Sequence, residues 1–177
     1  EIQKSVVSNM KSNRVIELLE SMPANEAAEV LQMLPAHKSL ELINMMSPEN
    51  AEAVKKLFQY NSDVAGGLMS TKFITIPASF TAEQTINKLR QLAISSRDVY
   101  YLYVSDDDGK LTGVLSLRDL IISPPERKVT EFMIADAIKV TVETPKEEVY
   151  KAMNKYNLMA LPVIDLKGKL VGVIFAD

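Results

Sequence analysis

A hydroxyl and a carboxylate stand three positions apart in the stretch GVLSLRDL, residues 113–120. Ser116 follows an apolar run that is predicted to be a strand, and the S-x-x-D spacing to Asp119 is typical of a helix start. A carboxylate in this place can also accept hydrogen bonds from the two neighbouring hydroxyls of a ribose, and Arg118 beside it can bind phosphate. The stretch therefore predicts either a helix cap or one end of a nucleotide site.

The composition excludes several kinds of chemistry. The chain has 177 residues, a net charge of −3 and no cysteine, so disulfides and thiolate metal sites are impossible, and no basic excess favours a nucleic-acid partner. A single histidine, His37, rules out a multi-histidine metal site, and we expect it to be solvated at a helix start. No apolar run approaches the ~18–20 residues that span a bilayer, and no signal peptide opens the chain. These features predict a soluble, globular polypeptide.

Residues 1 to about 60 are predicted to be helical, because apolar residues recur there at helical spacing. Pro23, Pro35 and Pro48 recur at nearly equal spacing, and each suits a helix start, where a missing N–H costs little. A unit of one helix and one turn is too small to bury its apolar face alone. We therefore expect the units to stack into a small superhelix.

The pattern changes after residue 65, where the Gly-Gly pair at 66–67 is predicted to end the helical part. Strand, helix, strand, strand and helix then follow in this order, and the order repeats. The hairpin residues of the two copies are separated by one constant offset, as in the pair Gly113 and Gly172. The upstream pair Met69 and Met133 is separated by a slightly larger offset. The first copy therefore carries a short insertion, near SSRDV. The repeated order predicts an internal duplication.

Turn and cap residues support the repeated order. Thr81 is predicted to cap the helix of the first copy. Thr144 is predicted to cap that of the second, with Pro145 at the first helical position and Glu147 closing a capping box. The stretch DDDGK at 106–110 is predicted to make a hairpin turn, because a calcium loop would need ligands spread over about a dozen residues.

The tandem units, with the stretches LPVID-x-x-GKLVGVI and GVLSLRDL, resemble a pair of CBS domains. The preceding helices, followed by DVAGGLMST, resemble the cytosolic N domain of the MgtE family of magnesium channels. The resemblance covers the whole chain and implies an α+β fold, with an all-α helical-repeat superhelix followed by a tandem CBS pair. We expect an N domain at residues 1–64, truncated at its start, and CBS domains at 65–127 and 128–177, the second truncated at its end.

The resemblance implies a nucleotide site between the CBS domains, since some members of the family bind ATP there. Arg118 and Asp119 would hold the phosphates and the ribose, and Tyr101, Ile138 and Leu158 would form the apolar slot for an adenine. The alternative is that Asp119 only caps its helix, that Arg118 is only solvated, and that the two aliphatic residues are plain core.

The family also implies a regulatory Mg²⁺ site, for which oxygen ligands are required. The candidate ligands are Glu26 and Glu29, three positions apart on one predicted helix face, Asp63 at the junction, and Glu147 at the start of a later helix, beside Glu148. Carboxylates repel one another without a cation, so removal of Mg²⁺ should push the domains apart. Taken singly, each of these residues could be an ordinary solvated carboxylate.

The two copies differ at the feature described first, because Phe175 falls where the first copy has Ser116. The partner of Asp119 would fall at position 178. We therefore expect one nucleotide site rather than two, at the Arg118–Asp119 end.

The resemblance predicts a regulatory sensor without catalysis, at the cytoplasmic face of the membrane. It would sense Mg²⁺, dimerise through its CBS domains and gate an attached transmembrane pore, and ATP would tune the response. The alternative is a stand-alone CBS protein that senses adenine nucleotides and has a helical partner-docking domain. An enzyme is the weakest hypothesis, because the sequence has no nucleophile–base constellation and no Walker-type glycine-rich loop.

Overall fold

Four helices form the first part of the computed structural model, which describes residues 12–92 and 100–176. They are α2 (Ser12–Ser21), α3 (Ala24–Gln32), α4 (Ala36–Met45) and α5 (Pro48–Phe58), and together they are called the helical domain below. Pro48 is the first residue of α5, whereas Pro23 and Pro35 occupy the N-cap positions of α3 and α4. The prediction that each proline starts a helix is confirmed.

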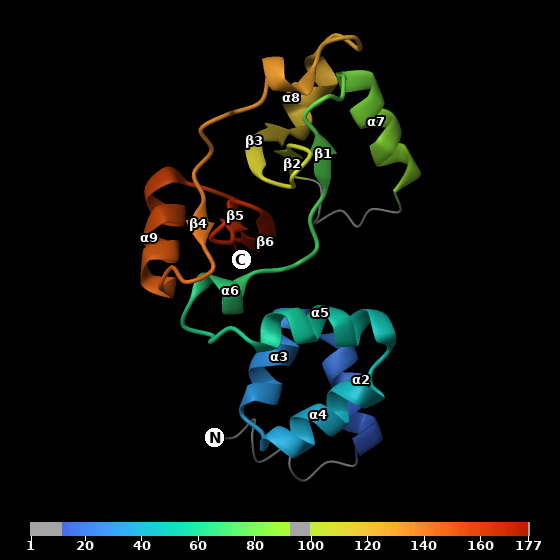
Figure 1. Ribbon diagram of the computed structural model, residues 1–177, viewed down its shortest axis with the longest axis vertical. Helices are drawn as coiled ribbons and strands as arrows, with labels where there is room; N and C mark the ends of the chain where they lie inside the picture. Colours follow the sequence, from blue (N-terminus) through green and yellow to red (C-terminus); the bar gives the residue numbers. More distant parts are fainter. Residues whose placement is uncertain (1–11, 93–99, 177) are drawn as a thin grey trace.

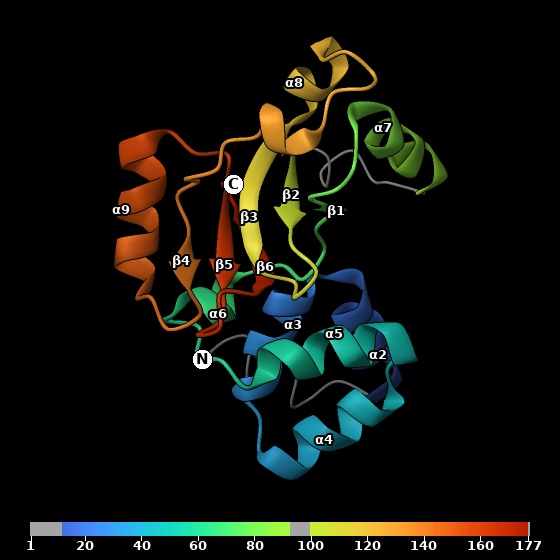
Figure 2. The ribbon, with the colours of Figure 1, turned by 45° about the horizontal axis from the view of Figure 1, so that its top comes forward.

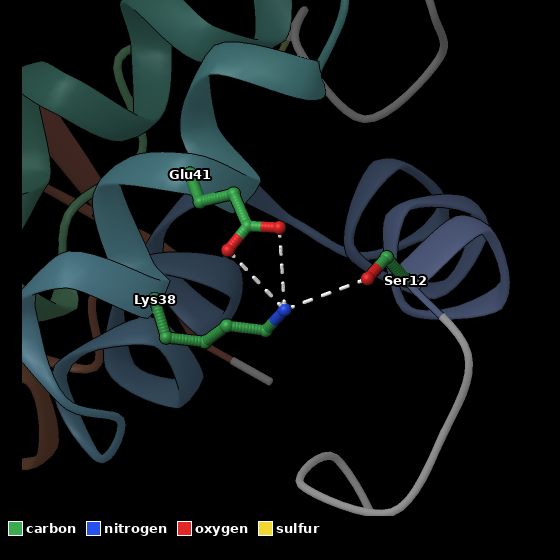
Figure 3. Close-up of polar contacts among 3 residues, drawn as sticks. All are labelled: Ser12, Lys38 and Glu41. Carbon is green, nitrogen blue, oxygen red and sulfur yellow. Dashed lines mark hydrogen bonds and ion pairs between the residues drawn. The ribbon is translucent and has the colours of Figure 1, made fainter.

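The helices of the helical domain pack against one another through the apolar side of each helix. Its fully buried side chains include Leu19, Leu31, Leu42 and Leu57. Polar contacts join neighbouring helices: the buried Ser39 hydroxyl donates to the carbonyl of Leu31 at 2.6 Å. Figure 3 shows a second tie, in which the Lys38 ammonium lies 3.4 Å from the Ser12 hydroxyl of α2 and 3.4 Å from the carboxylate oxygens of Glu41. His37 is exposed, as expected.

Two similar units follow the helical domain. The first repeat consists of β1 (Thr75–Pro77), α7 (Ala82–Gln91), β2 (Tyr101–Ser105), β3 (Leu111–Ser116) and α8 (Leu117–Ile122). The second repeat consists of β4 (Val140–Thr141), α9 (Lys146–Tyr156), β5 (Ala160–Ile164) and β6 (Leu170–Phe175). A short 3₁₀ turn, η2 (Val129–Glu131), lies between them. In both sheets the first strand pairs in parallel with the second, and the second pairs antiparallel with the third. The predicted duplication of an α+β unit is confirmed.

The hairpin turns of the two repeats have the same construction. One carboxylate oxygen of Asp106 accepts from the backbone N–H groups of Asp108 and Lys110 at 2.9 and 3.0 Å. Asp165 makes the same pair of bonds, at 2.8 and 3.0 Å. Gly109 and Gly168 have φ values of +79° and +82°, which a residue with a side chain rarely adopts. The acidic stretch at 106–108 is therefore a hairpin turn, as predicted.

Two details of the predicted elements are wrong. Gly66 and Gly67 do not end the helical part, since they lie inside a short helix, α6 (Ala65–Leu68). Thr144 does not cap α9, and Glu147 closes no capping box there, because Pro145 is the N-cap residue rather than the first helical residue. The Thr144 hydroxyl instead accepts from the backbone N–H of Thr141 at 3.1 Å. The predicted cap at Thr81 is confirmed, with Gln84 completing a capping box. The predicted insertion near SSRDV falls at 93–99, outside the described residues.

The division of the hydrophobic core does not follow the order of the domains along the chain. One cluster runs without interruption from the helical domain into the second repeat and includes Leu57, Met69, Val149 and Leu161. The first repeat has a core of its own, built on residues such as Leu102 and Leu120. A small third cluster joins the two sheets. Figure 1 shows the corresponding arrangement, with the second repeat between the helical domain at the bottom and the first repeat at the top.

The segments that precede the two repeats are exchanged. Ser70, upstream of β1, pairs with Val173 of β6 in the second sheet, through backbone bonds of 2.8 and 2.9 Å. Ile134, upstream of β4, pairs in the same way with Val114 of β3 in the first sheet. Each repeat therefore completes the sheet edge of the other, and neither is a closed unit by itself.

Candidate nucleotide and cation sites

The end of β3 carries the residues of the stretch GVLSLRDL. Ser116 is the N-cap of α8: its hydroxyl accepts from the backbone N–H of Asp119 at 3.0 Å and donates to the Asp119 carboxylate at 2.6 Å. Both residues are half-buried, and Arg118 between them is exposed. A carboxylate has about four acceptor positions, so one bond from a hydroxyl leaves capacity for a ligand. The capping role is confirmed, and it is compatible with binding to a ribose.

Tyr101 lies beside this cap. The strand register places it directly opposite Ser116 on the neighbouring strand β2. Its ring is half-buried and packs against the cluster between the two sheets, which also contains Ala137 and Phe175. The structure therefore brings Tyr101, Arg118 and Asp119 to one end of the first sheet, at the border with the second repeat.

Ile138 and Leu158 come from the second repeat. Both are half-buried, and both pack against the core that this repeat shares with the helical domain. Ile138 directly follows Ala137, which packs in the same cluster as Tyr101. These two residues thus lie at the edge of that core, and their packing explains their apolar character without a ligand.

Asp63 is the candidate cation ligand that touches another domain. Its carboxylate forms an ion pair with the Lys146 ammonium at the start of α9, and its carbonyl accepts from the Lys146 backbone N–H at 2.9 Å. The hydrogen bond that the Lys146 ammonium donates to Asp63 raises the pKa of Lys146, which is already cationic at neutral pH. Glu147, the next candidate, directly follows Lys146 and is exposed in the first turn of α9, as is Glu148.

Glu26 and Glu29 lie on α3, exposed, as expected for solvated helix carboxylates. Glu26 lines a groove of about 940 Å³ between the α2–α3 turn, α5 and the end of β6. Glu20 lines the same groove, but its carboxylate accepts from the backbone N–H of Ser47, which lowers the pKa of Glu20. Within residues 12–92 and 100–176, no three acidic or histidine side chains converge on a point that could hold a metal ion.

The sequence reasoning missed Lys146. A lysine beside candidate acidic ligands is an obvious counter-ion. Its pairing with Asp63 could not be inferred from the sequence, because the two residues are 83 positions apart. The duplication offers a clue, because the equivalent position in the first repeat, at the start of α7, is Ala82. A charge that appears in only one of two copies points to a contact that the other copy lacks.

Comparison with known proteins identifies the family to which these domains belong. The model of the CBS domain matches residues 62–125 and 129–176, and that of the MgtE intracellular N domain matches residues 1–63. The chain belongs to the CBS domain family. An MgtE-type N domain precedes its CBS pair, as the resemblance predicted.

Magnesium transporters are among the curated relatives. The chain is 39% identical over 132 residues to the magnesium transporter MgtE of Thermus thermophilus, and 34% identical over 132 residues to that of Bacillus subtilis. These alignments cover 75% of this chain and only 29% of each relative, so the chain spans less than a third of their length. None of the helices in the described part of the chain combines the length and hydrophobicity that a membrane span requires.

Solved structures agree with the fold over nearly the whole chain. The cytosolic domain of the Mg²⁺ channel MgtE, in complex with ATP, superposes with a TM-score of 0.82 at 32% identity, covering 97% of this chain and 75% of that one. The soluble part of a magnesium transporter gives a TM-score of 0.82 at 28% identity, covering 99% and 68%. The predicted fold, an N domain followed by tandem CBS domains, is confirmed.

Proposed function

We propose that this chain is the regulatory region of a magnesium transporter, and that it senses Mg²⁺ through carboxylates at the contact between the helical domain and the second CBS repeat. One observation carries the proposal. The helical domain and the second repeat share one continuous core, Glu26 lines the groove beside that contact, and Asp63 binds Lys146, the residue before Glu147. A cation bound at the edge of this contact would favour the closed arrangement, because it can bind carboxylates from both sides only when the two sides are close together.

The chemistry of the donor set is suited to Mg²⁺. This ion takes oxygen ligands and keeps several of its waters, so one or two carboxylates on facing elements are sufficient. Asp63, which follows the helical domain, is bound to the start of α9, where Glu147 lies, whereas Glu26 and Glu29 are on α3. In this role the ion would bind the closed arrangement more tightly than the open one and so shift the equilibrium between them, and the attached pore would respond.

The direct experiment is small-angle X-ray scattering of the chain in chelator and in millimolar Mg²⁺. We expect the radius of gyration to fall on addition of Mg²⁺, and we expect Glu147→Gln to weaken that response. Glu83→Gln is the matched control, because Glu83 is the first-turn carboxylate of α7 that corresponds to Glu147 in the other repeat. Superimposable profiles with and without Mg²⁺ would contradict the proposal for this chain.

An adenine nucleotide is proposed as a second ligand, held at the Arg118–Asp119 end of the first sheet. The Ser116 hydroxyl holds the Asp119 carboxylate, Tyr101 lies opposite Ser116 on the neighbouring strand, and the similar cytosolic domain of MgtE was solved with ATP. The alternative function is a stand-alone nucleotide sensor. It predicts thermal stabilisation by ATP, ADP or AMP with little response to Mg²⁺ alone, so the scattering experiment separates the two.

We also propose that the chain forms a homodimer through its CBS domains. Ile121 and Ile122 of α8 are 67% and 71% exposed, although they are large apolar residues. Adjacent exposed apolar side chains on one short helix suit a protein contact. Light scattering should give the mass of two chains, and Ile121→Glu should reduce it to that of one.

A further inference from the structure

The segment from Tyr60 to Ser70 connects the helical domain to β1 of the first repeat. It is called the strap below. The chain continues from the strap into the first repeat, but the strap contacts the helical domain and the second repeat. The strap contains α6, and Figures 1 and 2 both show α6 beside the second sheet.

The helical domain holds the strap through two side-chain amides of α3. The Gln32 amide donates to the carbonyl of Phe58 at 2.8 Å and to that of Tyr60 at 2.7 Å. The Asn25 amide donates to the carbonyl of Leu68 at 3.4 Å. The two ends of the strap are thus tied to the same helix.

The second repeat holds the strap from Asp63 to Ser70. The backbone N–H of Ala65 donates to the carbonyl of Thr144 at 2.8 Å, and that of Gly66 donates to Val142 at 2.9 Å. Asp63 is bound to Lys146 through both its backbone and its side chain. At the far end, Ser70 pairs with Val173 of β6. These bonds reach the segment around β4, the start of α9 and β6.

The two glycines of α6 let the strap close on itself. A Cβ on Gly67 would lie 2.2 Å from the backbone carbonyl oxygen of Asn61, and one on Gly66 would lie 2.5 Å from the ring of Tyr60. Backbone cannot move aside as the end of a flexible side chain can, so an alanine at 67 must displace residues 61–62. The close approach explains why the sequence has Gly-Gly inside a helix, where glycine costs roughly 1 kcal/mol relative to alanine.

We propose that the strap couples the position of the helical domain to the second repeat, so that a movement of the helical domain reaches the second repeat without passing through the first. The division of the core supports this coupling, since Ala65 and Met69 of the strap belong to the cluster that joins the helical domain to the second repeat. The first repeat has a separate core. The coupling goes beyond the proposed function, because it is a property of the closed chain at any fixed Mg²⁺ concentration.

Distances between spin labels test the coupling, and the absence of native cysteines makes paired labelling clean. One pair joins exposed positions of α5 and α9, Lys55→Cys and Asn154→Cys, and reports on the helical domain against the second repeat. The other joins α7 and α9, Glu83→Cys and Asn154→Cys, and reports on the first repeat against the second. Both are measured by pulsed dipolar spectroscopy at one fixed Mg²⁺ concentration.

We expect Gly67→Ala to widen the α5–α9 distance distribution at least about twofold and to leave the α7–α9 distribution unchanged. Gly113→Ala is the control, because its methyl group would press on Met133, which lies in the segment that connects the two repeats. It should affect the α7–α9 pair and not the α5–α9 pair. An unchanged α5–α9 distribution in folded Gly67→Ala, or equal changes in both pairs, would overturn the proposal.

If circular dichroism shows that Gly67→Ala does not fold, Lys146→Gln takes its place, with Lys151→Gln on the same helix as its control. Lys146→Gln removes one tie of the strap without adding volume. It should widen only the α5–α9 distribution, and an effect no larger than that of Lys151→Gln would overturn the coupling. A separate wild-type measurement in chelator tests the proposed function: distances equal to those in Mg²⁺ would contradict that function and leave the coupling intact.

Discussion

The two CBS repeats have one backbone plan and different surroundings. Both place a parallel pair and an antiparallel hairpin in the same register, and both break that register at the same place, at Val104 and at Val163. The first repeat, however, surrounds a core of its own, whereas the core of the second continues into the helical domain. The duplication therefore preserves the folding unit, and the side chains at its edges decide what each copy contacts.

Single positions show how the copies diverged. Ser116 in the first repeat caps a helix and holds Asp119, whereas the equivalent Phe175 packs in the apolar cluster between the sheets. Ala82 starts α7 without a charge, whereas the equivalent Lys146 starts α9 and binds Asp63. The first copy thus has a polar end suited to a ligand, whereas the second has a charged contact to the strap.

The largest effect is expected from the equivalent core leucines Leu102 and Leu161, both of which are 0% exposed. Leu→Ala at either position should lower the free energy of unfolding by about 2–5 kcal/mol, because a buried side chain is lost and a cavity remains. Only Leu161→Ala should also reduce amide hydrogen-exchange protection in α3 and α5, because its cluster includes the helical domain. Equal loss of that protection in Leu102→Ala would mean that the cores are not separate.

The next effect concerns the polar end of the first repeat. Asp119→Ala should weaken adenine-nucleotide binding at least about tenfold, because hydrogen bonds to charged groups contribute roughly 1.5–3 kcal/mol. It should leave the Mg²⁺-dependent compaction largely intact, which calorimetry and scattering on the same sample can check. Loss of both responses would mean that Asp119 chiefly supports the fold.

The sequence predicted the pattern of the repeats better than the contacts between them. Periodicity and the constant offset between the two hairpins located the strands and the helices, because these depend on neighbours along the chain. The exchange of Ser70 and Ile134 between the sheets depends on partners outside their own neighbourhood in the chain, as the pairs with Val173 and Val114 show. Periodicity carries no information about such pairs.

The candidate site divides in the same way. The cap between Ser116 and Asp119 was predictable because its two residues are three positions apart. Lys146 beside Asp63 was not, since the helical domain must first dock on the second repeat. Thr144 was assigned as a cap on its position next to Pro145, but its hydroxyl bonds back to Thr141 in the preceding turn. A backbone N–H in the first turn of α9 and that of Thr141 lie at similar separations from Thr144 along the chain, so the local sequence does not decide which of them its hydroxyl binds.

A smaller effect is expected from the cap itself. Ser116→Ala should lower the free energy of unfolding by about 1 kcal/mol, with roughly 0.5–2 kcal/mol as the usual range for a lost cap. Amide hydrogen exchange should locate the loss in α8, and Ser79→Ala, at an exposed position before α7, should have no such effect. Loss of protection spread over the whole first repeat would contradict a local capping role.

The smallest effect concerns the charge that only the second repeat carries. Asp63 raises the pKa of Lys146, so the ion pair stabilises the folded chain fully below the ordinary lysine pKa of 10.5, and this contribution is lost as the pH rises through the higher folded value. Urea unfolding of wild type and Lys146→Gln should therefore differ slightly at neutral pH and converge in strong alkali, whereas Lys151→Gln should match wild type throughout. Because both groups are exposed, the difference at neutral pH should be small and should shrink in high salt. A difference that persists in strong alkali would show that Lys146 acts through its aliphatic chain, and that the second repeat holds the helical domain by packing rather than by charge.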